Sequence, residues 1–319
     1  MDDIGRLITL AGAREPIPDE RFERVRHNVR AHWQQVVVEQ KAIKHPRDFK
    51  FMAIAASLVL VAGSIMLLWN LSGTPTPRSL ASVERIMGDV KILDVAALTN
   101  SVITTNTPIT TGSNGRLALR MSGGQSLRID TASHVVVHAP DHVSLQTGAV
   151  YIDSSFATED KPIIVSTAFG TARDIGTQFQ VRVTGKLLVI GVRKGLVEVT
   201  QSGQQILSIN RGSRFELNAD GKSEQHALQP DDPDWAWVET ITPEFDIEGV
   251  SLAQYLRWFA LERGVDLVWA DSTSEAKAGA ALLTGSIAGT RLDEGLLLVK
   301  QVAPFEHRLS GDSLWVKVE

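Results

Sequence analysis

The sequence predicts a membrane-anchored, multi-domain protein with an N-terminal α helix, a single transmembrane helix, an all-β antiparallel domain and a small α+β domain. Three observations lead to this fold class. One long uncharged segment interrupts a polar chain, the residues after it alternate with the period of strands, and the last quarter changes to helical spacing. The expected boundaries are 1–48, 50–70, 80–225 and 240–319.

The uncharged segment predicts the membrane span. Residues 51–69 hold no charged side chain, and Ser57 and Ser64 are the polar ones. As a helix they would reach about 28 Å, close to the ~30 Å hydrocarbon core of a bilayer. A buried helix of a soluble protein usually keeps a polar stripe, and the apolar part of a signal peptide is shorter and follows a short basic leader. Neither description fits residues 51–69, which follow 50 residues of mixed composition.

The flanks of this segment predict its orientation. Four basic residues lie within 41–50, whereas residues 71–90 hold two, Arg78 and Arg85. Basic residues beside a span stay preferentially on the cytoplasmic side. We therefore expect the N-terminus inside and the long C-terminal part outside.

Composition excludes several classes of function. The net charge of −5 divides into +2 for residues 1–50 and −7 for the rest, without the basic face of a nucleic-acid-binding protein. The chain has no cysteine, and it lacks a Walker-type phosphate loop, a G-x-S-x-G elbow and an H-E-x-x-H motif. We expect no catalytic site, no cofactor and no enzyme activity.

Three histidines spaced by four, His134, His138 and His142, raise the question of a metal site. On a strand, His134 and His138 face the same way, opposite Val135 and Val137, as on a solvated polar face. We expect no metal to bind there.

Residues 19–44 predict one amphipathic helix, which Asp19 caps and Pro46 ends. Its apolar side holds the candidate binding residues Phe22, Val25, Val29, Trp33 and Val36. With no further domain to cover it, this side needs a protein partner, a second copy or the membrane surface, unless the helix is only a topogenic leader.

Residues from about 80 to 220 alternate as half-buried strands do. In "GRLALRMSGGQSLRID", Leu117, Leu119 and Met121 point one way, and the Gly123-Gly124 pair allows a tight reversal. Many short strands with regular turn signals predict an antiparallel sandwich or barrel-like stack.

One stretch of this domain is more specific. In "VSTAFGTARDIGTQFQVRV" (165–183), Thr177 and Phe179 share a strand face, and Gly176 lies where a bulge is expected. Together with "SLRIDTASHVVV" and "LQTGAVYID", this stretch resembles the periplasmic domain of FecR-type membrane regulators. We interpret Gly176, Thr177 and Phe179 as determinants of the fold, without chemistry of their own.

The proline-containing segment 229–244 predicts a linker, with Trp235 and Trp237 packing between domains. Beyond it, two segments repeat with an offset of 40 residues. The corresponding positions are Ile247, Gly249, Leu252 and Leu256 in one copy and Ile287, Gly289, Leu292 and Leu296 in the other. Each copy predicts a short strand that ends at glycine, followed by a helix. This β-α-β doublet resembles the short N-terminal domain of secretins and TonB-dependent transducers.

The FecR resemblance implies a function. It suggests a single-pass inner-membrane anti-sigma factor and signal relay, with a cytoplasmic N-terminus and a periplasmic C-terminus. Its implied partners are an extracytoplasmic-function sigma factor, bound by the helix at 19–44, and an outer-membrane TonB-dependent transducer, bound by the terminal module. The alternatives are an anchor or assembly component for a secretin or transporter, and an envelope enzyme or ligand receptor, which the missing catalytic motifs disfavour.

Overall fold

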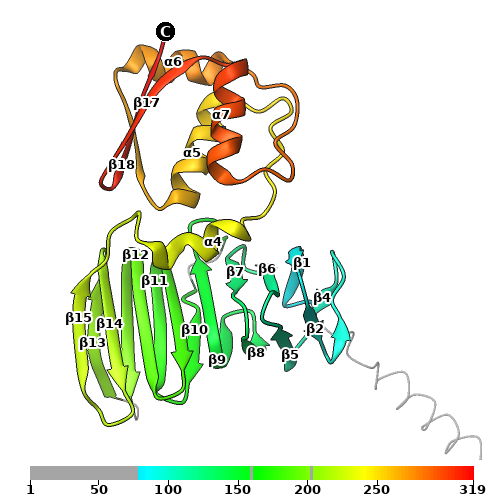
Figure 1. Ribbon diagram of the computed structural model, residues 1–319, viewed down its shortest axis with the longest axis vertical. Coiled ribbons are helices and arrows are strands. Elements are labelled where there is room, and N and C mark those ends of the chain that lie inside the picture. Colours follow the sequence, from blue (N-terminus) through cyan, green and yellow to red (C-terminus); the bar gives the residue numbers. More distant parts are fainter. Residues whose placement is uncertain (1–77, 159–160, 202–203) are drawn as a thin grey trace, which may run out of the picture. The chain divides into compact units, whose positions relative to one another are not determined.

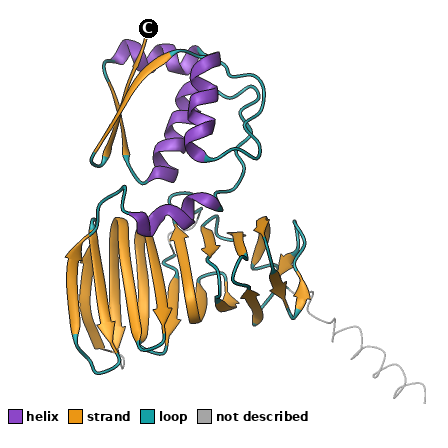
Figure 2. Ribbon diagram, in the orientation of Figure 1, coloured by secondary structure: helices purple, strands orange, loops and turns teal. Residues whose placement is uncertain are grey.

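A computed structural model describes residues 78–158, 161–201 and 204–319. Strands make up the β domain, and the helices of the described residues belong to the segment after it and to the C-terminal module (Figures 1 and 2). The strands of the β domain are β1 (Ala81–Met87), β2 (Val90–Ile92), β3 (Val95–Ala96), β4 (Val102–Ile103), β5 (Thr107–Thr111), β6 (Arg116–Met121), β7 (Ser126–Ile129), β8 (His134–Ala139), β9 (His142–Asp153), β10 (Ile164–Thr167), β11 (Gly170–Thr184), β12 (Leu187–Gln201), β13 (Gln204–Asn210), β14 (Ser213–Asn218) and β15 (Ser223–Ala227).

Three long strands, β9, β11 and β12, each pair with different neighbours along their two halves. One half of each belongs to a sheet in which the hydrogen-bonded strands follow the order β15-β14-β12-β11-β9-β7-β6-β1-β4. The other half pairs with β13, β10 or β8, and β8 continues through β5 to β2 and β3. Apart from the parallel pair of β9 and β10, all these pairings are antiparallel. This agrees with the antiparallel strand stack expected from the alternation.

The strand register shows which residues share a face of the sheet that runs from β15 to β4. One row of paired residues faces the core and is apolar throughout: Ile86, Leu117, Ile129, Val150, Val181, Ile190 and Phe215. The neighbouring row, displaced by one residue, lies on the opposite face and is largely polar. We call it the outer row: Arg85, Ala118, Arg128, Tyr151, Gln180, Gly191 and Arg214. Because side chains alternate along a strand, a one-residue step exchanges core for surface.

Glycines with positive φ lie where the three long strands change neighbours. Gly148 of β9, Gly176 of β11 and Gly195 of β12 have φ values of 89°, 66° and 80°. The pairing of β11 with β12 shifts register between Ile175 and Phe179, which marks a bulge at Gly176. Left-handed backbone is inexpensive for glycine alone, so these residues allow the strands to bend.

Residues 229–244 are folded against the outer row, and we call them the strap. They contain the 3₁₀ helix η1 (Pro233–Trp235) and the short helix α4 (Ala236–Thr240). The strap buries apolar side chains against the sheet in a cluster of Ala118, Ala149, Tyr151, Leu228, Trp235, Trp237, Val238 and Ile241. The segment predicted as a linker is therefore packed, and both tryptophans contribute to that packing.

The C-terminal module contains α5 (Leu252–Arg263), β16 (Asp266–Trp269), α6 (Ser272–Ala280), α7 (Leu292–Val302), β17 (Phe305–Ser310) and β18 (Ser313–Val318). Its sheet has the order β16-β18-β17, with β16 parallel and β17 antiparallel to β18. Ser251 caps α5 in a capping box with Gln254, and Gly264 ends the helix with a φ of 69°. The module has its own apolar core.

The repeat is present as two turn-helix units rather than two strand-helix units. Gly249 and Gly289 have φ values of 73° and 76°, and α5 and α7 follow them. Within the described module, no strand leads directly into either glycine. Gly249 N–H instead donates to the carbonyl of Leu283, whose own N–H donates to that of Val250, and Ser251 forms an isolated bridge with Leu282. An isolated bridge is not a strand pair, so the prediction of short strands that end at Gly249 and Gly289 was wrong.

The expectation of a single transmembrane helix as part of the fold class is also corrected. Of the helices in the described ranges, none is long and apolar enough to cross a membrane. The longest of them, α5, has 12 residues and reaches about 18 Å, against the ~30 Å of a bilayer core. Residues 1–48 and 50–70, which carried the predicted inner helix and span, lie outside the described residues. The described fold is a β domain followed by a small α+β module.

Candidate coupling site between the β domain and the C-terminal module

Charged side chains of the β domain are buried where the strap and α5 meet the outer row. Arg128 of β7 is 1% exposed, and its Nη2 donates to Oε2 of Glu262 near the end of α5, at 2.6 Å. Its Nη1 donates to the carbonyl of Val238 at 3.0 Å and to Oγ1 of Thr242 at 3.2 Å. One side chain of the sheet thus holds both the strap and the module.

Burial raises the pKa of Glu262, and the adjacent guanidinium of Arg128 opposes that shift. Arginine stays protonated in proteins, so Arg128 brings a permanent charge into this dry site. Breaking such a pair leaves an uncompensated buried charge, which costs more free energy than the intact pair contributes.

A second arginine makes parallel contacts. Arg193 of β12 donates from Nη1 to the carbonyl of Glu262 at 3.0 Å and from Nη2 to Oε1 of Glu239 in the strap at 3.2 Å. Its guanidinium carbon lies 5.0 Å from the centroid of the Trp235 ring. A Cβ atom at Gly264 would lie 2.2 Å from Nε of Arg193, so glycine at the end of α5 makes room for this side chain.

Further polar contacts connect the two parts. Asp266 of β16 accepts from Lys194 at 3.0 Å and from Arg211 at 2.8 Å, and these bonds lower its pKa against the opposing effect of burial. Nε2 of Gln178 donates to the carbonyl of Leu261 at 3.0 Å. We call the whole set, with Arg128, Arg193, Glu239 and Glu262, the coupling site. Its groups hold the strap and the module against the β domain, and they include no nucleophile beside a general base.

The three predicted motif residues of the β domain lie at the bend of β11. Phe179 is fully buried in the core, and Thr177 is 1% exposed. Sequence reasoning missed Asp174, whose Oδ1 accepts from the backbone N–H of Thr177 at 2.7 Å and from its hydroxyl. The Ser154 hydroxyl bonds the other carboxylate oxygen. Burial raises the pKa of Asp174 against these hydrogen bonds. An aspartate three residues before a threonine is a turn signal that could have identified it.

The other predicted positions lie apart from the coupling site. Ile247, Leu252, Leu256, Ile287, Leu292 and Leu296 are buried in the core of the module. Phe22, Val25, Val29, Trp33 and Val36 lie outside the described residues.

The histidines form hydrogen bonds within the β domain. The rings of His138 and His142 lie 5.0 Å apart, and His138 bonds Asn106 and Ser144. His142 bonds Ser166, and burial lowers its pKa, as does the neighbouring His138. Across the described ranges, no group of three or more histidine, aspartate or glutamate side chains is arranged to hold a metal ion.

Comparison with solved structures and with curated proteins gives distant matches. A crystal structure at 1.65 Å of an anti-sigma factor candidate from Parabacteroides distasonis ATCC 8503 matches with 14% identity and a TM-score of 0.36, covering 66% of this chain and 99% of that one. A second crystal structure under the same description, at 2.50 Å, has a TM-score of 0.35 and 14% identity, covering 66% of this chain and 98% of that one. No curated protein matches the chain.

The family comparison covers the centre of the β domain. Residues 107–198 match the model of the FecR protein family. The match extends from β5 into β12 and includes Gly176, Thr177, Phe179 and the glycine bends of the long strands. It confirms the resemblance predicted from the motif, and the chain carries a FecR domain.

Proposed function

We propose that this protein regulates an extracytoplasmic-function sigma factor and relays a signal to it from a partner of the C-terminal module. The match of residues 107–198 to the FecR family carries this proposal. The helix predicted at 19–44 would bind the sigma factor, and the module would receive the signalling partner, for which a TonB-dependent transducer is our candidate.

The coupling site supports a relay because it joins the module to the FecR domain through buried charges. Arg128 and Arg193 each bond both the strap and α5. A partner that shifts α5 would act directly on side chains fixed in β7 and β12. An anchor without a relay role would not need this connection.

The module also has surface suited to a partner. Four aliphatic side chains on α7 and the loop before it are 40–66% exposed: Leu282, Leu297, Leu298 and Val302. All four lie on α7 or in the loop before it, and exposed apolar side chains that gather on one part of a surface mark interaction sites. Strands β16 and β17 each pair only with β18 in the described module, so a partner strand could add to either edge.

Co-purification of the full chain with the sigma factor encoded beside its gene tests the first half of the proposal. Trp33→Ala should weaken binding about tenfold or more, because burying such a side chain in a partner contributes about 1.5–3 kcal/mol. Gln34→Ala, on the polar side of the predicted helix, is the matched control. Equal retention by wild type and Trp33→Ala, or retention by neither, would contradict sigma binding and favour the anchor.

A transcriptional reporter tests the second half. Leu297→Asp combined with Val302→Asp should abolish the response to the partner's signal while leaving co-purification of the sigma factor unchanged. Lys300→Ala, on the same helix, should leave both intact. A response unaffected by the double substitution would contradict the role of the α7 surface.

A further inference from the structure

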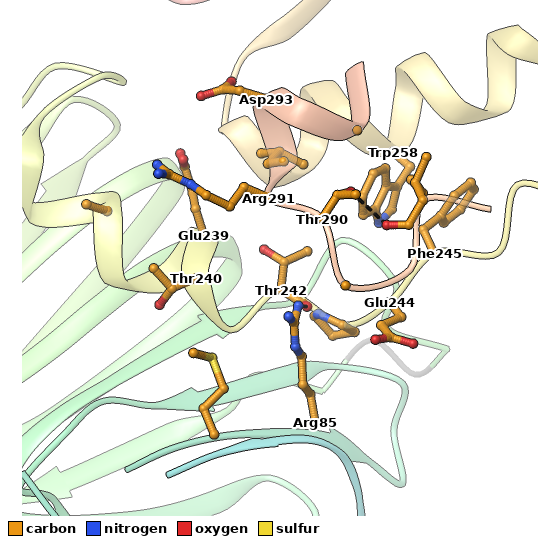
Figure 3. A pocket seen from close by; sticks show the side chains of 17 residues that line it. Arg85, Glu239, Thr240, Thr242, Glu244, Phe245, Trp258, Thr290, Arg291 and Asp293 are labelled. Carbon is orange, nitrogen blue, oxygen red and sulfur yellow. Dashed lines mark hydrogen bonds between the residues drawn. The ribbon is translucent and has the colours of Figure 1, made fainter. Parts of the chain in front are cut away.

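A pocket of about 470 Å³ lies beside the coupling site, and we call it the junction pocket. Arg85 and Met87 of β1, the end of the strap, Trp258 of α5 and the residues leading into α7 line it (Figure 3). Its volume lies within the range of about 300–1,000 Å³ that is usual for ligand sites. Neither the FecR match nor the proposed relay assigns it a role.

The charges of the junction pocket favour an anion. Glu239 is bonded by Arg193 and Arg263, and Asp293 by Arg263, so the negative charge of these two acids is compensated. Glu244, the third acid of the lining, is exposed and forms no ion pair in the described part of the chain, so the charges of Arg85 and Arg291 together exceed it by one. Arg85 donates to a neutral acceptor, the carbonyl of Thr242, at 2.5 Å. Within the described part of the chain, neither Arg85 nor Arg291 forms an ion pair. Two guanidinium groups therefore have donors left for a carboxylate, which they can bind through parallel hydrogen bonds.

An aromatic wall adds a second kind of contact. The rings of Phe245 and Trp258 stack at a centroid distance of 4.6 Å and an interplanar angle of 19°. Both side chains are half-buried and line the junction pocket. Figure 3 places them on the side of the pocket opposite Glu239 and Arg291. A bound molecule can thus pack apolar groups on one side and carboxylates on the other.

The edge of β1 favours a peptide over a small anion. Strand β4 pairs with Ala81 and Ser82 alone, while β6 pairs along β1 as far as Met87. Among the residues that the structure describes, the outer edge of β1 from Glu84 to Met87 has no strand partner. Arg85 and Met87 of this segment line the junction pocket. A free edge beside a pocket is the arrangement by which an extended peptide adds as a strand and inserts side chains.

We propose that the junction pocket binds an extended acidic peptide segment of a partner protein. Carboxylates of the peptide bond Arg291 and Arg85, and its apolar side chains pack on Phe245 and Trp258. The residues of this site differ from those proposed to bind the sigma factor and from the exposed aliphatic residues of α7. The test of the peptide site can therefore fail without contradicting the proposed sigma-factor helix or the proposed role of the α7 surface.

Fluorescence anisotropy with the full chain tests the proposal. The probe is a labelled, terminally blocked peptide of about eight residues that alternates valine and glutamate, and a valine–lysine peptide of equal length is compared. We expect the glutamate peptide to bind at least tenfold more tightly, with affinity that falls as salt increases. Absence of binding, or equal binding of the two peptides, would overturn the proposal.

Substitutions identify the site. Arg291→Gln, an exposed change, should weaken the glutamate peptide at least tenfold, and Trp258→Ala should weaken it further. Arg257→Gln is the matched control, because that arginine lies on α5, pairs with Glu275 and does not line the junction pocket. Circular dichroism establishes that each variant is folded. An Arg291→Gln variant that binds as tightly as wild type would locate the peptide elsewhere and overturn the assignment.

Discussion

The Gly-Thr-x-Phe motif organises the bend of β11 through hydrogen bonds that begin at Asp174. Its carboxylate accepts from the backbone and hydroxyl of Thr177 and from Ser154, and it thereby joins β11 to the end of β9. Gly176 supplies the positive φ of the bend, and Phe179 anchors the part of β11 that follows it in the core. Each motif residue has its own physical task, and none of these tasks is catalytic.

Two glycines at this bend should respond differently to alanine. A Cβ at Gly176 would meet nothing within 4 Å, whereas one at Gly195 would lie 2.8 Å from the carbonyl oxygen of Gly176 and 2.5 Å from Cγ2 of Thr177. Gly176→Ala should cost about 1–2 kcal/mol, the price of left-handed backbone. Gly195→Ala should cost more, because the clash with backbone is added. Urea unfolding measures both, and equal losses would contradict the steric argument.

At the scale of elements, the strap decides which face of the sheet is covered. Its apolar side chains pack on Ala118, Ala149 and Tyr151. Its Val238 carbonyl accepts from Arg128 of the outer row, and its Glu239 carboxylate accepts from Arg193 of β12. The end of α5 meets the same row through Glu262. A polar row on a sheet normally faces solvent, and here the strap and the module supply its partners.

The pair of Arg128 and Glu262 should show strong coupling in a double-substitution cycle. Arg128→Met alone should lower the free energy of unfolding by about 3–5 kcal/mol, because Glu262 remains buried without its partner. Arg128→Met together with Glu262→Leu should recover a large part of that loss. Arg173→Met, which breaks the exposed pair with Glu198, is the control and should cost less than about 1 kcal/mol. Additive losses in the double variant would mean that the two side chains do not act together.

At the scale of the molecule, the FecR domain and the C-terminal module have separate cores but share the strap and the coupling site. Residues 78–319 belong to a single compact unit. A partner that binds the module would therefore act on a compact unit that also contains the FecR domain. This property is the one a relay requires.

Unfolding should accordingly be one cooperative transition for the described part of the protein. Tryptophan fluorescence and far-ultraviolet circular dichroism should give coincident urea curves for wild type. Trp235→Ala should cost about 3–5 kcal/mol and separate the curves into two steps, because Trp235 packs on Tyr151 and under Arg193. Two steps already present in wild type would show that the domains fold independently, as the predicted linker implied.

Periodicity in the sequence was enough to predict the antiparallel β domain and the apolar faces of α5 and α7, because these depend on neighbours within one element. The FecR resemblance came from the motif at Gly176, Thr177 and Phe179 and from the segments around it. The same local signals produced errors where context decides, as in the short strands expected before Gly249 and Gly289. Only the tertiary structure revealed the coupling site and the junction pocket. Arg128 and Glu262 are 134 residues apart, and nothing in either local pattern distinguishes a buried partner from a solvated charge. Strand register brings such residues together, and register is set by the whole sheet.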